Sequence, residues 1–257
     1  FVLYSTPEGG IQGMNGSGRA PAASDAADLR AQGMTTIAGS SPHSVTVPGA
    51  IDAFCQLAQT VGKLGIDRLL APAIHYADAG IPVAPRVAMD WASEQDALQG
   101  SALKHFLDSG KPLKLGQLFR APGQAEVLRR VARDGRDAFY TGEIAEDMVA
   151  TLNRAGGVHT LDDFAATACV ETAPVAGTYR GTDLVEHPPN GQGATAILLL
   201  NILSHFDLTG MDPDGAERAH IEAEAAKLAY DARNRFIADP DHTTRLDHML
   251  APETAAR

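Results

Sequence analysis

The sequence has few cysteines and no long apolar run, and both shortages exclude classes of protein. Its 257 residues include only Cys55 and Cys169, which are too few for a disulfide framework and lack the CxxC spacing of a zinc or redox motif. The two cysteines either pair with each other or remain as buried thiols, and we favour the thiols. The longest apolar run, residues 196–200, is interrupted by Asn201 and is too short to span a bilayer.

Basic residues are also in short supply. The chain has 21 Lys and Arg against 32 Asp and Glu, a formal net charge of -11. A surface of that sign repels phosphate backbones, so we expect no nucleic acid as a partner. Without an apolar span we expect no membrane partner either. No signal peptide is visible, and the sequence leaves the compartment open between cytoplasm and periplasm. With 44% hydrophobic residues, the composition is that of a globular protein with a core.

Motifs of several common enzyme classes are missing. There is no P-loop, no GxSxG nucleophile elbow and no HExxH zinc motif, and the glycines at 13, 16 and 18 have the wrong spacing for a dinucleotide fingerprint. The histidines and aspartates of residues 239–248 follow a proline and are typical of a solvated loop. We therefore expect no metal and no cofactor in this chain.

A catalytic nucleophile is missing as well. Thr243 and Thr244 form a tempting pair, but an N-terminal threonine works because its own free amine serves as the base. Both threonines are internal, and Phe1 carries no nucleophilic atom. We expect no catalytic residue in this chain.

The order of predicted elements favours an α+β fold. Strands are expected at residues 1–4 and 10–14 around a turn at 7–10, then at 45–47, 173–179 and 182–186. Helices are expected from Ser24 or Asp25 to about Gln32, and over 51–58, 69–79, 87–99, 124–133, 142–153, 194–206 and 216–237. Without regular βαβ alternation, this order excludes Rossmann and TIM architectures and indicates antiparallel strands packed under helices. No composition shift marks a linker, so we expect one domain over residues 1–257.

Several segments together resemble the gamma-glutamyltransferase family. Residues 139–145 match its FY.G.IA signature, and the glycine pair at 156–157 with Thr160 and Asp163 matches GG..T..D. Thr160 and Asp163 also have the spacing of a capping box at a helix start. Further matches lie at residues 47–49, 70–80, 179–193 and 223–240. Each motif is weak alone, but they occur in the family's order over nearly the whole chain.

The resemblance implies a four-layer αββα sandwich of the N-terminal-nucleophile hydrolases, made from a precursor that cleaves itself. This chain would be the large subunit. A small subunit beginning with the catalytic threonine would be its partner and would complete the sandwich, and a small-molecule amide would be the substrate. We expect the family's first helix region to precede Phe1 and the threonine to follow the chain's end.

One departure from the family's pattern concerns the loop at residues 15–21. Transferases of the family carry an Arg-Glu pair shortly before an Ala-Pro, and the arginine binds the α-carboxylate of the glutamyl substrate. Here Ser17 takes the arginine's place, Gly18 replaces the glutamate, and Arg19 lies two residues later. This version resembles the acylase and amidohydrolase branch, which includes cephalosporin-acylase-like and oxamate-amidohydrolase-like members.

The candidate substrate-binding residues are therefore Asn15, Ser17 and Arg19. An arginine in a glycine-rich loop offers a planar fork to a carboxylate, but it also forms structural salt bridges, and both readings stay open. For residues 188–193 a structural turn is favoured over a binding loop. Two functions remain, a subunit of an amide-cleaving enzyme or a non-catalytic binding or structural protein that retained the fold.

Overall fold

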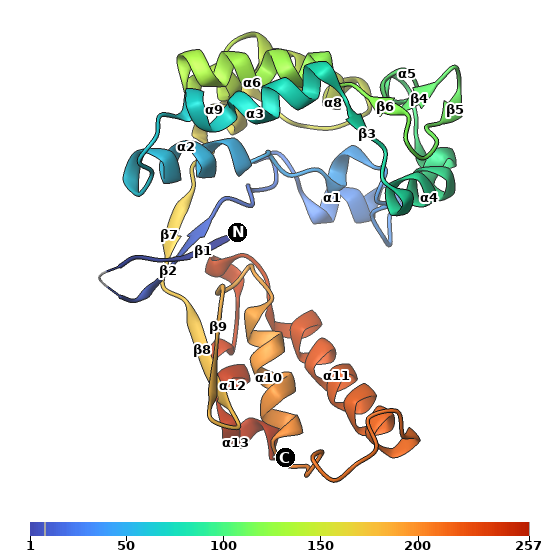
Figure 1. Cartoon of the computed structure of the whole chain (residues 1–257). Helices are drawn as coiled ribbons and strands as arrows, with labels where there is room; N and C mark the ends of the chain where they lie inside the picture. Colours follow the sequence, from blue (N-terminus) through green and yellow to red (C-terminus); the bar gives the residue numbers. More distant parts are fainter. Residues whose placement is uncertain (8, 257) are drawn as a thin grey trace. The chain divides into compact units, whose positions relative to one another are not determined.

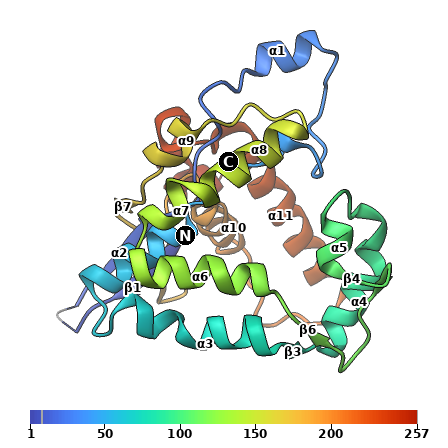
Figure 2. The same ribbon diagram turned by 90° about the horizontal axis from the view of Figure 1, so that it is seen from above.

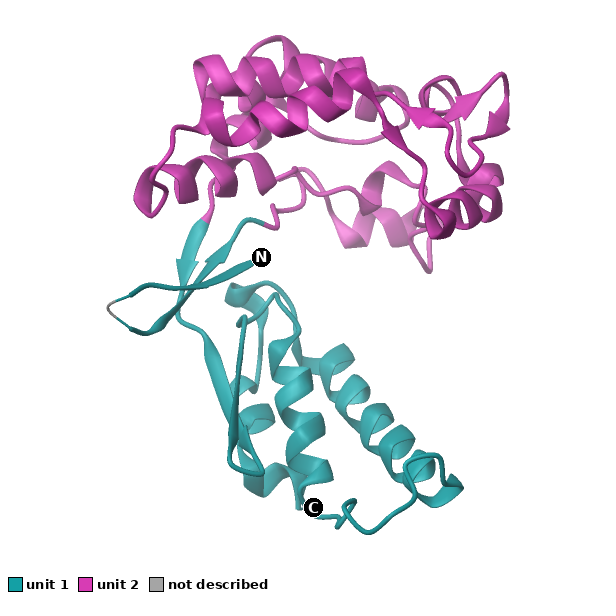
Figure 3. Ribbon diagram, in the orientation of Figure 1, with its two compact units in different colours: residues 1–16, 170–257 teal, residues 17–169 magenta. Residues whose placement is uncertain are grey.

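The computed structural model describes residues 1–7 and 9–256, which divide into two compact units (Figure 3). One unit consists of residues 1–16 and 170–257, and the other of residues 17–169. Glu8, in the expected turn at residues 7–10, lies outside the described residues. The expectation of one domain over residues 1–257 stays a prediction.

The strands of the first unit form an antiparallel sheet and a separate hairpin (Figure 1). β1 (Val2–Ser5) pairs with β2 (Ile11–Asn15), and β2 pairs in turn with β7 (Val170–Thr172). β8 (Val175–Tyr179) and β9 (Thr182–Glu186) pair with each other. The strands expected at residues 1–4, 10–14, 173–179 and 182–186 are confirmed, although β7 was not predicted.

The helices of this unit are α10 (Gly193–Leu203), α11 (Ala216–Phe236), η3 (Pro240–His242), α12 (Leu246–Leu250) and α13 (Pro252–Ala255). α10 is apolar on nearly every face because it packs against β8, β9, α11, α12 and α13 (Figure 1). β8 comes so close to α10 that a Cβ added at Gly177 would lie 2.6 Å from Ile197 Cγ2. A glycine is therefore required at this crossing.

The second unit, residues 17–169, is mostly helical. Its longer helices are α2 (Ala50–Thr60), α3 (Ile66–Ala79), α4 (Pro85–Glu94), α6 (Pro122–Asp134) and α8 (Glu143–Arg154), and α3 and α6 lie side by side (Figure 2). The shorter elements are α1 (Ala26–Ala31), η1 (Pro42–Ser44), η2 (Gln95–Ala97), α5 (Ala102–Phe106), α7 (Asp137–Tyr140) and α9 (Leu161–Ala166). Two-residue strands pair as β3 (Ile81–Pro82) with β6 (Leu118–Phe119) and as β4 (Leu107–Asp108) with β5 (Lys111–Pro112).

The core of the second unit gathers side chains from α2, α6, α7, α8 and α9 and from the loop before α2. Its buried members are Val47, Ile51, Cys55, Val131, Phe139, Tyr140, Ala145 and Phe164. Burial raises the pKa of the Cys55 thiol, and the nearby carboxylate of Asp52 adds to this effect while Arg136 opposes it. Both Cys55 and Cys169 are thiols in the structure, which agrees with the expectation, although Cys169 is only half-buried.

One local prediction for the second unit was wrong. Residues 45–47 do not form a strand, because the backbone N–H of Val47 donates to the carbonyl of Arg19 instead of joining a ladder. The helix at α2 is confirmed, but its buried face includes Asp52, while Phe54 is 48% exposed. Among the described residues, no helix is both long enough and apolar enough to cross a membrane.

Candidate substrate-binding site

The loop after β2 begins with Asn15, the last residue of that strand. Its side-chain amide donates a 2.8 Å hydrogen bond to Oδ1 of Asn190, and both residues belong to the first unit. Asn190 lies in the turn that leads into α10. The first of the three candidate residues thus ties β2 to this turn, and its role in substrate binding stays a prediction.

The next part of the loop is fixed by its backbone. The carbonyl of Ser17 accepts from Thr46 Oγ1 at 3.4 Å, and the carbonyl of Arg19 accepts from the backbone N–H of Val47 at 2.9 Å. Ser17 and Arg19, which belong to the second unit, are therefore placed side by side with residues 46–47. The structure brings these two candidate residues together on one anchored loop.

Gly18 permits this close approach. Its φ is +77°, a conformation that side-chain-bearing residues rarely adopt, and an added Cβ would lie 1.7 Å from the carbonyl oxygen of Val47. The backbone seen here therefore has no room for the glutamate that the transferases carry at this position. The contact with Val47 therefore requires glycine at position 18 in this backbone.

The Arg19 side chain is exposed, whereas Pro21, two residues later, is buried. The loop is thus held through its backbone and through the buried Pro21. A planar guanidinium can bind a carboxylate with two parallel hydrogen bonds, and the role of Arg19 in substrate binding stays a prediction.

The far end of the loop is tied to α9. The backbone N–H of Ala22 donates a 2.8 Å hydrogen bond to Oδ1 of Asp163, while Oδ2 accepts from the backbone N–H and the hydroxyl of Thr160. The predicted capping box is confirmed. Partial burial acts to raise the pKa of Asp163, but the hydrogen bonds from Ala22 and Thr160 outweigh it and hold the pKa below its usual value.

Residues at and beside the turn at 188–193 make structural contacts. His187 is buried, its Nδ1 lies 2.9 Å from the carbonyl of Pro188, and its Nε2 lies 3.2 Å from Thr172 Oγ1. Because a carbonyl only accepts, Nδ1 carries the proton and the Thr172 hydroxyl donates to Nε2. Arg233 Nη1 donates to Gln192 Oε1 at 3.0 Å. These contacts support the structural reading of the turn.

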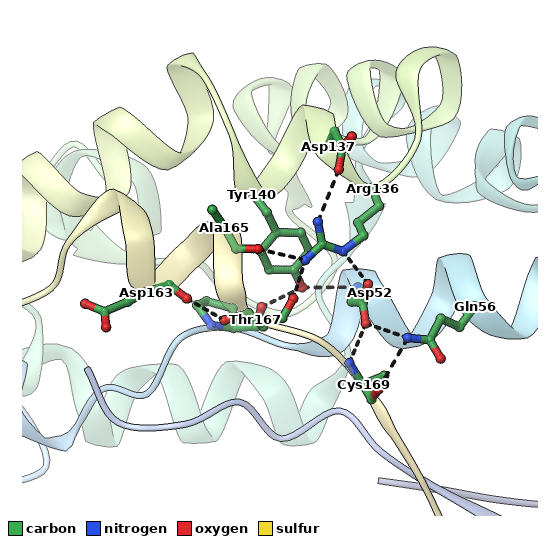
Figure 4. Close-up of polar contacts among 10 residues, drawn as sticks. Asp52, Gln56, Arg136, Asp137, Tyr140, Asp163, Ala165, Thr167 and Cys169 are labelled. Atoms are coloured by element: carbon green, nitrogen blue, oxygen red, sulfur yellow. Dashed lines mark hydrogen bonds and ion pairs between the residues drawn. The ribbon is translucent and has the colours of Figure 1, made fainter. Parts of the chain in front are cut away.

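A buried ion pair was not predicted (Figure 4). Asp52, 1% exposed, accepts from Arg136 Nε at 2.5 Å, from Gln56 Nε2 at 2.9 Å and from the backbone N–H of Cys169 at 2.5 Å. Arg136 also donates to the carbonyl of Thr167. The pair fastens residues 167–169 to α2, so its role is structural. One acidic residue between Ile51 and Ala53 was the only signal in the sequence.

Tyr140 contacts both members of the Asp52–Arg136 ion pair. The Arg136 guanidinium lies over its ring at 4.6 Å, its hydroxyl donates to the carbonyl of Pro48 at 2.7 Å, and it accepts from the backbone N–H of Asp52 at 3.1 Å. Burial raises the pKa of Tyr140 to about 12. The FY.G.IA motif thus supplies core packing and holds the segment before α2. Among the described residues, no group of three or more His, Cys, Asp or Glu side chains could hold a metal ion.

Comparison with known proteins places this chain in a family. The gamma-glutamyltranspeptidase model matches residues 1–257. The oxamate amidohydrolase proenzyme of Klebsiella pneumoniae is 32% identical over 263 residues, covering 98% of this chain and 49% of that protein. The glutathione hydrolase-like YwrD proenzyme of Bacillus subtilis is 33% identical over 199 residues, 77% of this chain and 38% of that protein.

Solved structures of the same family have the same fold as this chain. The cephalosporin acylase of Bacillus halodurans superimposes with a TM-score of 0.89 at 32% identity, covering 99% of this chain and 49% of that one. The chain spans about half or less of the length of the curated relatives it matches. Its α+β class is confirmed, and its fold is that of the αββα N-terminal-nucleophile hydrolases. The chain belongs to the gamma-glutamyltranspeptidase family.

Proposed function

We propose that residues 1–257 act as one large-subunit domain of a self-processing amidohydrolase. The nucleophile is the N-terminal threonine of a small subunit cut from the same precursor, as the names of the proenzyme relatives support. Its hydroxyl attacks the amide carbonyl, its own amine acts as base, and backbone donors hold the oxyanion. Water then releases the acyl group, in preference to an acceptor amine. The enzyme names of the relatives do not favour the non-catalytic alternative.

This chain contributes half of the sandwich and one wall of the substrate pocket. We assign recognition of the substrate to the loop of Asn15, Ser17 and Arg19. Arg19 binds a carboxylate on the substrate, and Ser17 contributes at most one neutral hydrogen bond, which is weaker than a charged pair. The preferred substrate is an amide other than a gamma-glutamyl amide.

The observation that carries this specificity is the backbone at Gly18. Its positive φ and its contact with the Val47 carbonyl leave no room for a side chain at this position, which supports a binding loop without the Arg-Glu pair expected in the transferases. Moving the arginine by two residues along an extended loop displaces its root by roughly 6–7 Å. The oxamate amidohydrolase relative, which aligns over 98% of this chain, supports the same branch.

A substrate panel tests the proposal. The full-length processed enzyme and its Arg19→Ala variant are assayed on a gamma-glutamyl anilide, on oxamate, and on a glutaryl amide with its uncharged butyryl counterpart. Losing a charged hydrogen bond lowers kcat/KM about 10- to 100-fold, and we expect this loss for oxamate and the glutaryl amide but not for the butyryl amide. A gamma-glutamyl anilide turned over best by a wide margin would contradict this assignment of the loop.

A further inference from the structure

The turn from His159 to Asp163 forms part of the GG..T..D motif. Its side chains cap α9, but they also make hydrogen bonds to Ala22 and Val45, which capping does not require. His159 is 1% exposed, and Asp163 is half-buried at the start of α9. Both make hydrogen bonds that lead to the loop carrying Arg19.

The first connection is direct. Asp163 uses one carboxylate oxygen for α9, where Oδ2 accepts from Thr160, and the other oxygen for the loop, where Oδ1 accepts from the Ala22 N–H at 2.8 Å. An N–H donating to a carboxylate makes a stronger hydrogen bond than one donating to a neutral oxygen. Ala22 follows the buried Pro21, so this bond fixes the loop three residues after Arg19.

The second connection runs through residues 45–47. His159 Nε2 lies 2.9 Å from the carbonyl of Val45 and donates to it, because a carbonyl can only accept. Two residues later the Val47 N–H donates to the carbonyl of Arg19 at 2.9 Å. The carbonyl of Val47 also packs on Gly18. His159 thus fixes residues 45–47, and these residues in turn fix the backbone of Arg19.

We infer that Asp163 and His159 are positioning residues that place Arg19 and thereby set the enzyme's preference for carboxylate-bearing amides. Asp163 fixes the loop of residues 17–22 at Ala22. His159 fixes it through Val45, because residues 45–47 bind the backbone of Arg19. Bidentate binding of a carboxylate depends on fixed geometry, so loosening either end weakens the Arg19 contact without touching the chemistry. This inference rests on the proposed role of Arg19.

Three variants of the full-length processed enzyme separate positioning from capping. Thr160→Ala removes the capping hydroxyl and leaves the bond between Asp163 and Ala22 intact. Asp163→Glu keeps a carboxylate of the kind that capping boxes commonly use, but the extra methylene displaces the oxygen that accepts from Ala22. Asp163→Asn keeps a carbonyl oxygen for Ala22 while its amide nitrogen cannot accept from Thr160.

The readouts are KM and kcat on a glutaryl amide and on the uncharged butyryl amide of the same amine, together with Tm. We expect Asp163→Glu to raise KM for the glutaryl amide about tenfold, with less than about a twofold change in kcat or in either constant for the butyryl amide. Asp163→Asn, which keeps a weaker neutral acceptor for the Ala22 N–H, raises the KM for the glutaryl amide less than Asp163→Glu does. Thr160→Ala lowers Tm and leaves the ratio of the two KM values unchanged.

His159 gives an independent pair of variants, which also decides the matter if Asp163→Glu does not fold. His159→Phe removes the donor to Val45 and raises KM selectively for the glutaryl amide, whereas His159→Gln retains a donor and stays close to wild type. If Thr160→Ala raises that KM as much as Asp163→Glu does, or if Asp163→Glu and His159→Phe leave it unchanged, the inference is wrong.

Failure of the inference and failure of the proposed function give different results. If Arg19→Ala keeps the preference for the glutaryl over the butyryl amide, the proposed role of Arg19 fails and the inference fails with it. If Arg19→Ala abolishes the preference while the Asp163 and His159 variants retain it, only the positioning role is overturned.

Discussion

Asp163 accepts a 2.8 Å hydrogen bond from the backbone N–H of Ala22, a residue 141 positions earlier in the chain. The same carboxylate caps α9 through Thr160. Together these donors hold the pKa of Asp163 below its usual value, although partial burial alone would raise it. The loop that carries Arg19 is thereby linked to the ionisation of one acidic side chain.

This link predicts an effect of acid on stability. A carboxyl group whose pKa is lowered by folding stabilises the native state above its unfolded pKa of about 4, and this contribution is lost as the pH falls through the lower folded pKa. We expect Asp163→Asn to flatten the acid side of the stability curve. Urea unfolding between pH 3 and 7, with Asp162→Asn as the exposed neighbouring control, measures it; equal slopes for the two variants would refute the link.

The close contact between Gly18 and the Val47 carbonyl predicts a loss of stability when a side chain is added at position 18. Gly18→Ala places a methyl group 1.7 Å from the Val47 carbonyl at a φ of +77°, while Gly135→Ala meets the same φ of +76° with no atom within 4 Å. The strain of a positive φ costs about 1 kcal/mol in both variants, and the clash adds more at Gly18 only. Thermal unfolding of the full-length enzyme should show the larger loss for Gly18→Ala. Similar losses would mean that the loop moves away from Val47 easily.

The Asp52–Arg136 pair predicts a large change in stability. Arg136→Met leaves the carboxylate of Asp52 buried without its cation, which costs about 3 kcal/mol. The matched control is Arg86→Met, which removes the 2.7 Å ion pair to Asp90 on side chains that are 82% and 53% exposed, where ion pairs contribute little. Urea midpoints compare the two. If both variants unfold at the wild-type midpoint, the buried pair is not stabilising.

The raised pKa of Tyr140 predicts how the free energy of unfolding changes at alkaline pH. Folding raises its pKa from an ordinary 10.0 to about 12, so its contribution is complete below pH 10 and is lost as the pH rises towards 12. Tyr140→Phe removes this dependence and also the hydroxyl shared by Asp52 and Pro48, which lowers stability at neutral pH by about 1–2 kcal/mol. Tyr4→Phe, at a surface hydroxyl bonded to Gln12, serves as the control. An unchanged alkaline slope in Tyr140→Phe would count against the assignment.

Local chemistry predicted the elements whose causes lie within a few residues. The capping box of Thr160 and Asp163, the β8–β9 hairpin and the helix α10 all follow from local sequence patterns, and the structure contains them. The order of family motifs added the fold, because it covers the whole chain.

Contacts between distant segments could not be read from spacing. The strand expected at residues 45–47 is a loop because its hydrogen bonds go to residues 17–19, about 29 positions away. Asp52 looked like an ordinary polar residue of α2, since its partner Arg136 lies 84 positions later. The fit of Gly18 against Val47 was equally invisible, because a glycine in a loop has many explanations.

The central claim is that the nucleophile of this enzyme lies outside this chain, at the start of a second chain released by self-cleavage. Intact-mass spectrometry and N-terminal sequencing of the purified full-length gene product test it most directly. We predict two co-purifying chains, the smaller beginning with threonine, and no amide cleavage after that threonine is changed to alanine. A single uncleaved chain with full amide-cleaving activity would contradict the account.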